Sequence, residues 1–299
     1  MVTWLKKQKT YLLIGYVFLL LIHFGFKDHL YVTGILFYAF PLPVLILAIF
    51  PLLALFYNKK RILFALLGLI GLLSFFWINH QYINYNIIDA NSANSILLWN
   101  IADQKDYNVD VLKKTLETQH IDALFFVEVL HEDNNFNAQF TKELNNYNIE
   151  FLEGNMMVAA KKGITVVDYI EEKNNYKLNH LKIEIEANTF EVVIVDIFAK
   201  PWHNKKKAFT KIYKYLEKHN IDIILGDFNT PYESIYFNHF KTNYTSARNF
   251  QNGFSATWPY PIPLLEIDHI WISKQLNILS TKKEFYSDSD HALLITDFK

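Results

Sequence analysis

Three long stretches without Lys, Arg, Asp or Glu lie near the N-terminus and constrain the fold more than any other feature. They cover residues 10–26, 30–58 and 62–79, and the second contains three prolines. An uncharged apolar segment of about 20 residues spans a bilayer as a helix. A cleaved signal peptide has one short apolar region and is not followed by two more. The sequence therefore predicts three transmembrane helices, the second bent by its prolines.

The positive charges around these stretches predict their orientation. They are Lys6, Lys7 and Lys9 before the first stretch, and Lys59, Lys60 and Arg61 between the second and third. Cytoplasmic flanks of membrane helices are enriched in Lys and Arg. We therefore expect a multi-pass protein of the plasma (inner) membrane with a cytoplasmic N-terminus. Everything after residue 79 would then be extracytoplasmic.

The remaining sequence has the composition of a soluble domain. Residues 1–90 carry seven Lys and Arg against two Asp and Glu, which leaves 22 basic and 28 acidic residues in the rest. A mildly acidic domain is poorly suited to holding long nucleic acid through many phosphate contacts. We expect a membrane anchor over residues 1–80, a polar, Asn-rich linker over 81–93 and a catalytic domain over 94–299.

Short apolar runs alternate with amphipathic segments in this domain. Strands are predicted at 95–99, 123–129, 158–160, 165–170, 181–186, 190–197, 221–225, 267–272 and 293–298, and helices at 109–118 and 206–218. Strands that alternate with helices and hairpins are typical of an α/β domain. We expect a two-sheet sandwich flanked by helices and preceded by the three transmembrane helices.

Polar residues stand at the ends of several apolar runs, where functional groups are commonly presented. They are Asn100 after ILLW, Glu128 after LFFV, Asp227 and Asn229 in ILGDFNT, Asp268 and His269 in EIDHIW, and Asp290 and His291 in SDSDHALL. Each alone is an ordinary strand-end or turn residue. Together they supply carboxylate and amide oxygens, which suit Mg²⁺ or Mn²⁺ and phosphate substrates. A His beside an Asp can accept a proton from water.

The order WN, VEV, GDFN, TWP with IDHIW, and SDHALL resembles the endonuclease/exonuclease/phosphatase superfamily of metal-dependent hydrolases. The resemblance covers the soluble domain and implies a deoxyribonuclease I-like fold. The three-span anchor and the ATWPYP stretch are similar to a membrane-anchored bacterial branch that includes the VanJ-type proteins. The longer ATWPYPIP segment has two equally good interpretations. It is either an apolar lip for a lipid substrate or a loop packed over the sheet edge.

The resemblance implies roles for the strand-end residues. The metal would be bound by Glu128, with Asn100 as a ligand or orienting residue and Asp290 on the metal side. Asp227 and Asn229 would position the attacking water and the phosphoryl oxygens. His291 would be the general base, paired with Asp268. His269 alternates to the opposite side of its strand and is not expected to be a second base.

One position departs from the family pattern. Asp196, in VDIFAKPWH, stands where the family often has a His that contacts the phosphate. Either Asp196 binds a second cation, or Lys200 or His203 replaces the lost donor, or catalysis is impaired. The neighbouring Lys205, Lys206 and Lys207 are expected on the solvated face of a helix.

These observations lead to one functional hypothesis and two alternatives. The first is a membrane-anchored hydrolase of phosphate ester or anhydride bonds that uses Mg²⁺ or Mn²⁺ and a His-activated water on a lipid-linked substrate. One alternative is an extracytoplasmic nuclease. The other is a catalytically impaired binding or sensor module with the same fold.

Overall fold

The computed structural model describes residues 2–86, 93–102, 109–130, 134–203 and 205–299. The chain divides into two compact units. One comprises Met1–Tyr82 with the short segments Lys200–Trp202 and Glu233–Ile235; the other comprises Ile83–Ala199, His203–Tyr232 and Tyr236–Lys299. Of the linker expected over 81–93, residues 87–92 lie outside the described residues. Before them, β1 (Tyr82–Asn84) pairs with β11 (Asn252–Phe254) in a two-stranded sheet.

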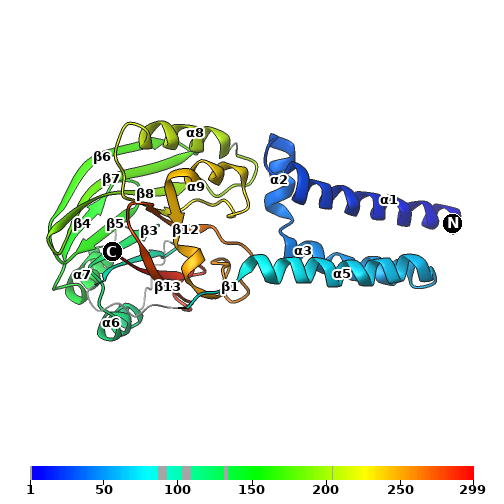
Figure 1. Cartoon of the computed structure of the whole chain (residues 1–299), viewed down its shortest axis with the longest axis horizontal. Coiled ribbons are helices and arrows are strands. Elements are labelled where there is room, and N and C mark those ends of the chain that lie inside the picture. Colours follow the sequence, from blue (N-terminus) through cyan, green and yellow to red (C-terminus); the bar gives the residue numbers. More distant parts are fainter. Residues whose placement is uncertain (1, 87–92, 103–108, 131–133, 204) are drawn as a thin grey trace. The chain divides into compact units, whose positions relative to one another are not determined.

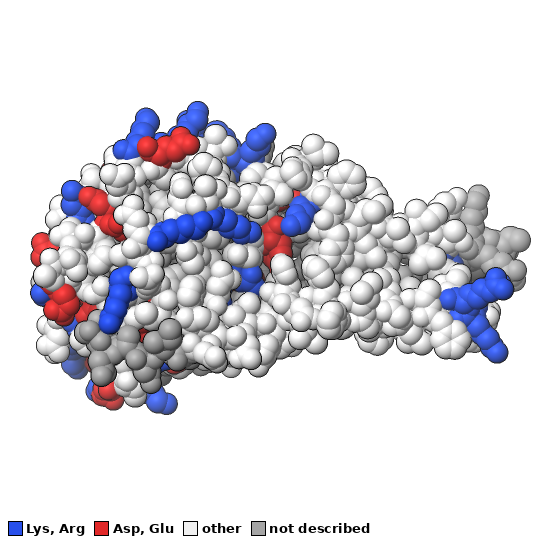
Figure 2. Space-filling model, in the orientation of Figure 1, with Lys and Arg blue, Asp and Glu red and all other residues white. Residues whose placement is uncertain are grey.

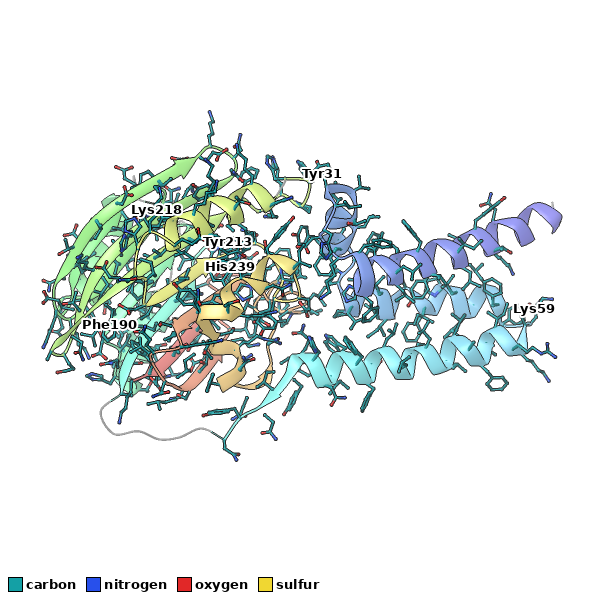
Figure 3. The ribbon with its side chains drawn as sticks, turned by 45° about the horizontal axis from the view of Figure 1, so that its top comes forward. Tyr31, Lys59, Phe190, Tyr213, Lys218 and His239 are labelled. Carbon is teal, nitrogen blue, oxygen red and sulfur yellow. The ribbon has the colours of Figure 1, made fainter. Side chains whose placement is uncertain are left out.

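The first unit consists mainly of apolar helices. They are α1 (Val2–Leu21), the π-helical turn η1 (Ile22–Phe26), α2 (Tyr31–Ala39), α3 (Leu42–Leu47), α4 (Ile49–Phe56) and α5 (Lys60–Gln81). Among the described residues, two helices are long and apolar enough to cross a membrane, Gln8–Phe26 and Lys60–Gln81. Figure 2 shows the surface of this unit as largely uncharged, and Figure 3 labels Lys59 in the basic loop before α5.

The second expected transmembrane helix is not continuous. Tyr31–Ala39 and Leu42–Phe56 meet at an angle of 71°. The break falls at Phe40 and Pro41, because proline has no N–H for the helix and disfavours the helical conformation of the residue before it. The structure therefore supports two spans by length and composition, or three if the bent pair counts as one.

The second unit contains two six-stranded sheets within the described residues, in the orders β10-β12-β9-β8-β7-β6 and β13-β14-β2-β3-β5-β4 (Figure 1). The first sheet is formed by β6 (Ile164–Glu172), β7 (Tyr176–Ile185), β8 (Asn188–Ile197), β9 (Ile223–Asp227), β10 (Tyr244–Ser246) and β12 (Asp268–Ser273). The second is formed by β2 (Asn94–Asn100), β3 (Ala123–Val127), β4 (Asn148–Leu152), β5 (Met156–Ala160), β13 (Ile278–Glu284) and β14 (Leu293–Phe298). The expected α/β two-sheet fold is confirmed.

The apolar residues of the strands alternate between two environments. One face of each sheet contributes to a shared core, in which Leu225 of β9 and Leu98 of β2 are fully or almost fully buried. The opposite faces pack under helices. α8 (Lys205–Leu216), α9 (Phe240–Asn243) and the 3₁₀ turn η2 (Ile235–Asn238) lie on the first sheet, and α6 (Val109–Thr118) and α7 (Asn134–Glu143) on the second. Figure 3 shows Tyr213 of α8 beside His239, with ring centroids 4.4 Å apart.

Candidate active site

The first sheet carries a row of polar residues at one end. Asp227, at the end of β9, is the register partner of Asp196 on β8 and of Asp268 on β12. Each is separated by two positions from an apolar residue of the core between the sheets, which Asp196 and Asp227 follow and Asp268 precedes. Strand side chains repeat on one face every second residue. Three carboxylates therefore line the inner face of the sandwich where the apolar core ends.

Asp227 accepts hydrogen bonds from two asparagines. Asn100, at the end of β2 in the other sheet, donates from Nδ2 to Asp227 Oδ2 over 3.0 Å. The backbone N–H of Asn229 donates to Asp227 Oδ1 over 2.7 Å, and Asn229 Nδ2 donates to Oδ2 over 3.0 Å. Burial, followed by repulsion from Asp268, holds the pKa of Asp227 well above its usual range, although His291 acts in the opposite direction.

Asn229 reaches Asp227 through a turn rather than along an extended strand. Its φ is +46°, in the left-handed region that Asn tolerates better than most residues. Its Nδ2 also donates to the carbonyl of Ile197 over 2.8 Å. The two side chains therefore do not project from one face of a regular strand. They nevertheless lie in direct contact.

His291 lies between the carboxylates. Its Nδ1 is 3.0 Å from both oxygens of Asp268, and its Nε2 is 4.0 Å from Asp227 Oδ2. The ring is almost fully buried. Burial disfavours the charged imidazolium, but the Asp268 carboxylate and its acidic neighbours outweigh burial and raise the pKa of His291 to about 10.

Backbone contacts hold His291 in this position. Ser289 Oγ accepts from the His291 N–H over 3.0 Å and donates to the Asn100 carbonyl over 2.7 Å. Trp99 Nε1 donates to the His291 carbonyl over 3.3 Å. Ser289 is not among the residues expected at the site from the sequence. Its place two residues before the histidine is the sequence signal that points to it.

Asp290 points one oxygen toward the same space. Its Oδ2 accepts a 2.7 Å hydrogen bond from Trp258 Nε1, so the TWP segment packs against the site at this point. Its Oδ1 lies 3.8 Å from His291 Nε2 and is a buried atom without a hydrogen-bond partner in the structure. The Asp290 side chain as a whole is 45% exposed, and a cation or water can satisfy this oxygen.

Glu128 follows β3 directly, beside the end of β2. Val127 is the register partner of Asn100 and belongs to the inner core, so regular alternation would turn Glu128 to the outer face. The φ of +56° at Glu128 breaks that alternation. Its charge contributes to the raised pKa of Asp227, which places it electrostatically within the same site.

Asp196 pairs with a lysine that is not among the residues expected at the site. Lys177 Nζ on β7 lies 3.2 Å from Asp196 Oδ2. Of the expected substitutes, Lys200 lies in a segment of the other compact unit, with Nζ 5.7 Å from the centroid of the Trp202 ring. The His203 ring packs edge-on against Phe198.

The position of Lys205 differs from the expected one. It is 3% exposed rather than part of a solvated helix face, and it donates to the carbonyl of Phe198. Burial lowers the pKa of Lys205 to about 8, against the opposing effect of Asp227 and Asp196. The helix starts here with its first lysine turned inward. His269 agrees with expectation, since it is buried on the outer side of β12 with Nε2 3.0 Å from the Thr230 carbonyl.

The donor set fits a hard divalent cation. Potential ligand atoms of Asp227, Asp268 and His291 lie within 4.8 Å of one another, and no cysteine occurs in the chain. Since Asp268 and His291 already engage each other, the oxygens left for a cation are those of the neighbouring Glu128, Asp290 and Asn100. A bound cation would satisfy the Asp290 oxygen and would offset the burial and the repulsion from Asp268 that together raise the pKa of Asp227. Such oxygen-rich sets favour Mg²⁺ or Mn²⁺.

Two packed sheets with a carboxylate-rich site and an Asp–His pair at one end are the features of a metal-dependent α/β hydrolase. The model of the Endonuclease/Exonuclease/phosphatase family matches residues 97–291, and the chain belongs to this family. Its members are metal-dependent phosphoesterases.

Solved structures show the same fold. The human Nocturnin catalytic domain with bound sulfate anion has 18% identity and a TM-score of 0.53, covering 72% of this chain and 97% of that one. D. rerio TDP2 complexed with single strand DNA product has 13% identity and a TM-score of 0.55, covering 70% and 100%. A family member from Bacteroides thetaiotaomicron has 12% identity and a TM-score of 0.51, covering 69% and 98%. Comparison with curated proteins gave no match.

Proposed function

We propose that this chain is a membrane-anchored, metal-dependent hydrolase of phosphate ester or anhydride bonds that acts on a lipid-linked substrate. The observation that carries the proposal is the orientation of His291. Its Nδ1 is engaged by Asp268, while its Nε2 faces Asp227 and Asp290. A histidine held in this way has one nitrogen available to accept a proton.

In the proposed reaction His291 Nε2 accepts a proton from water, and the water oxygen forms a bond to phosphorus. The bond from phosphorus to the leaving oxygen breaks, and its electron pair stays on that oxygen. Asp268 fixes the tautomer of His291 and stabilises the imidazolium. Asn229 and Asp227 orient the water and the phosphoryl group.

The carboxylates of Glu128 and Asp290, with the amide oxygen of Asn100, are the proposed cation ligands. Asn100 Oδ1 accepts from the Ala102 N–H over 2.8 Å, which fixes the orientation of the amide. Bound Mg²⁺ or Mn²⁺ would neutralise phosphoryl oxygens as a Lewis acid. Its positive charge beside Asp227 and Asp290 would also weaken their stabilisation of the imidazolium and would thereby lower the pKa of His291 toward the range of a general base.

The proposed anchor motivates the lipid-linked substrate and the VanJ-type branch. Large apolar side chains of α5 are exposed, with Phe64 and Phe75 each 68% exposed and Leu72 63%. Exposed apolar surface of this extent is expected to be covered by lipid. The basic residues before α5 support a cytoplasmic loop there, so that the catalytic domain is extracytoplasmic.

The test uses the full chain in detergent micelles or nanodiscs. Phosphomonoester, phosphodiester, lipid pyrophosphate and DNA substrates are assayed with Mg²⁺ and Mn²⁺, with chelator as the blank. We expect metal-dependent turnover, highest on the lipid-linked substrate, that His291→Ala abolishes. Metal-dependent turnover that survives His291→Ala would refute the mechanism.

Two outcomes favour the alternatives. DNA cleavage equal to or faster than lipid phosphate cleavage would identify a nuclease, against which the acidic composition of the domain argues. Metal binding without turnover on any substrate would identify a silent module.

A further inference from the structure

The carboxylate row of the first sheet continues into a lysine. Lys177 on β7 is the register partner of Asp196, which is in turn the register partner of Asp227. Lys177 lies four residues before Leu181 of the inner core, so alternation turns it to the same inner face. The side chain of Lys177 therefore lies at the end of a row of three carboxylates.

Asp196 holds the Lys177 ammonium close to the site. The two charged atoms are 3.2 Å apart, and the side chains are 29% and 12% exposed. An ammonium carries three donors, and Asp196 accepts one of them. The other two N–H donors lie beside Asp196 on β8, the strand between Lys177 on β7 and Asp227 on β9. The Cα atoms of Lys177 and Asp227 are therefore two strand spacings apart, about 10 Å, and the ammonium reaches toward the site over Asp196.

The lysine stem is confined by a tight turn. Gly154, between β4 and β5, has a φ of +78°, and a Cβ there would lie 2.9 Å from Lys177 Cδ and 3.1 Å from the Tyr169 hydroxyl oxygen. The next residue, Asn155, accepts from the Val129 N–H over 2.9 Å. Since Val129 follows Glu128, this turn connects the lysine stem to the proposed cation side of the site.

The Lys177–Asp196 pair also reduces the electrostatic repulsion of a phosphate. A lone ionised Asp196 would repel a phosphate, whereas its pairing with Lys177 makes this part of the row close to neutral. The buried ammonium of Lys205 acts on both Asp196 and Asp227 and adds a second positive charge. The Asp196 end of the row thus becomes favourable to an anion.

We propose that Lys177, positioned by Asp196, binds phosphoryl oxygens of the substrate. This inference rests on the proposed phosphoryl substrate and names a residue that recognises it. The bound oxygens belong either to the phosphoryl group that is cleaved or to a second one joined to it, as in a pyrophosphate. Asp196 acts here as a positioning residue rather than as a cation ligand.

The test measures binding of inorganic phosphate and of inorganic pyrophosphate to the full chain by calorimetry, with and without Mg²⁺. Hydrogen bonds to charged groups contribute about 1.5–3 kcal/mol, so Lys177→Met should weaken anion binding roughly 10- to 100-fold. Lys177→Arg should retain most of the affinity. Weaker binding of both anions indicates contact with the cleaved group, and selective loss of pyrophosphate binding indicates the adjoining group.

Lys182→Met is the matched control. Lys182 lies on the same strand, and its Nζ is 3.0 Å from Glu191, its register partner on β8. This variant removes an equivalent cross-strand pair away from the site and should leave anion binding unchanged. Equal losses in the two variants, or wild-type affinity in Lys177→Met, would overturn the proposal.

Asp196→Asn separates positioning from cation binding. If Asp196 positions Lys177 and binds no cation, Asp196→Asn keeps an acceptor oxygen for the ammonium, so anion affinity should be retained and the Mg²⁺ dependence should not move. A requirement for more Mg²⁺ would overturn the positioning role. Lack of turnover by the wild type would refute the proposed function, while the anion-binding comparison would still decide the role of Lys177.

Discussion

Asp268→Asn changes one atom of a buried carboxylate and tests the proposed role of the Asp268–His291 pair. In the wild type, His291 Nδ1 lies 3.0 Å from each oxygen of Asp268, which is 2% exposed. The asparagine keeps the shape but removes the charge. It also offers an NH₂ group to Nδ1, which would stabilise the tautomer with its proton on Nε2, where no proton can be accepted.

The size of the effect follows from two contributions. A charge-assisted hydrogen bond contributes about 1.5–3 kcal/mol, which corresponds to roughly 10- to 100-fold in rate. Imposing the wrong tautomer on a catalytic histidine can cost about 10⁴-fold in kcat. We therefore expect kcat to fall by between about 10² and 10⁴, with a much smaller change in KM.

Stability should fall together with activity, because the Asp268 carboxylate raises the pKa of the buried His291 and its loss leaves the imidazolium without that partner. Relief of the repulsion between Asp268 and Asp227 offsets part of this loss. Asp297→Asn is the matched control, since Asp297 accepts from Ser280 Oγ on the far part of β14. The assay is steady-state hydrolysis over a range of Mg²⁺ concentrations, with thermal unfolding measured in parallel.

Two results would contradict this reasoning. A kcat within a few-fold of wild type would show that the pair is not needed for proton transfer. A large increase in the Mg²⁺ concentration required for half-maximal activity would make Asp268 a cation ligand instead of an orienting group.

Three further variants test the cation site and the buried charges around it. Glu128→Gln should raise the Mg²⁺ concentration for half-maximal turnover by roughly tenfold or more, since it weakens the proposed main ligand; a metal titration of activity checks this. Arg248→Met should destabilise the chain by about 3–5 kcal/mol, because it leaves Glu266, whose Oε2 is 2.9 Å from Arg248 Nε, charged and buried. Adding Glu266→Leu should recover most of that loss in chemical denaturation, and failure to recover would refute the explanation. Burial lowers the pKa of Lys283 to about 8 from 10.5. The folded state then binds fewer protons than the unfolded state between these pH values, so stability should rise with pH in that window. The contribution of one group is at most about 1.4 kcal/mol per pH unit, and Lys283→Met should remove it.

The sequence predicted the elements whose signals are local. β2, α6 and β14 were expected within a residue or two of their observed ends, because each combines a clear period with polar boundaries. β4 was not expected, since it is an edge strand with mostly exposed residues and little alternation. α7 and β13 were also missed, because Asn and Gln in the helix and Lys, Ser and Thr in the strand weaken their patterns.

By itself, the sequence determined the apolar N-terminal stretches, the α/β class and the acids and histidine that follow apolar runs, because these are properties of composition and spacing. Only the tertiary structure decided which of these groups meet. Register between strands that are distant in the sequence brings Lys177, Asp196, Asp227 and Asp268 into one row. Such pairings depend on long-range packing of both sheets, which no local pattern encodes. That packing gives Asp196 its lysine partner.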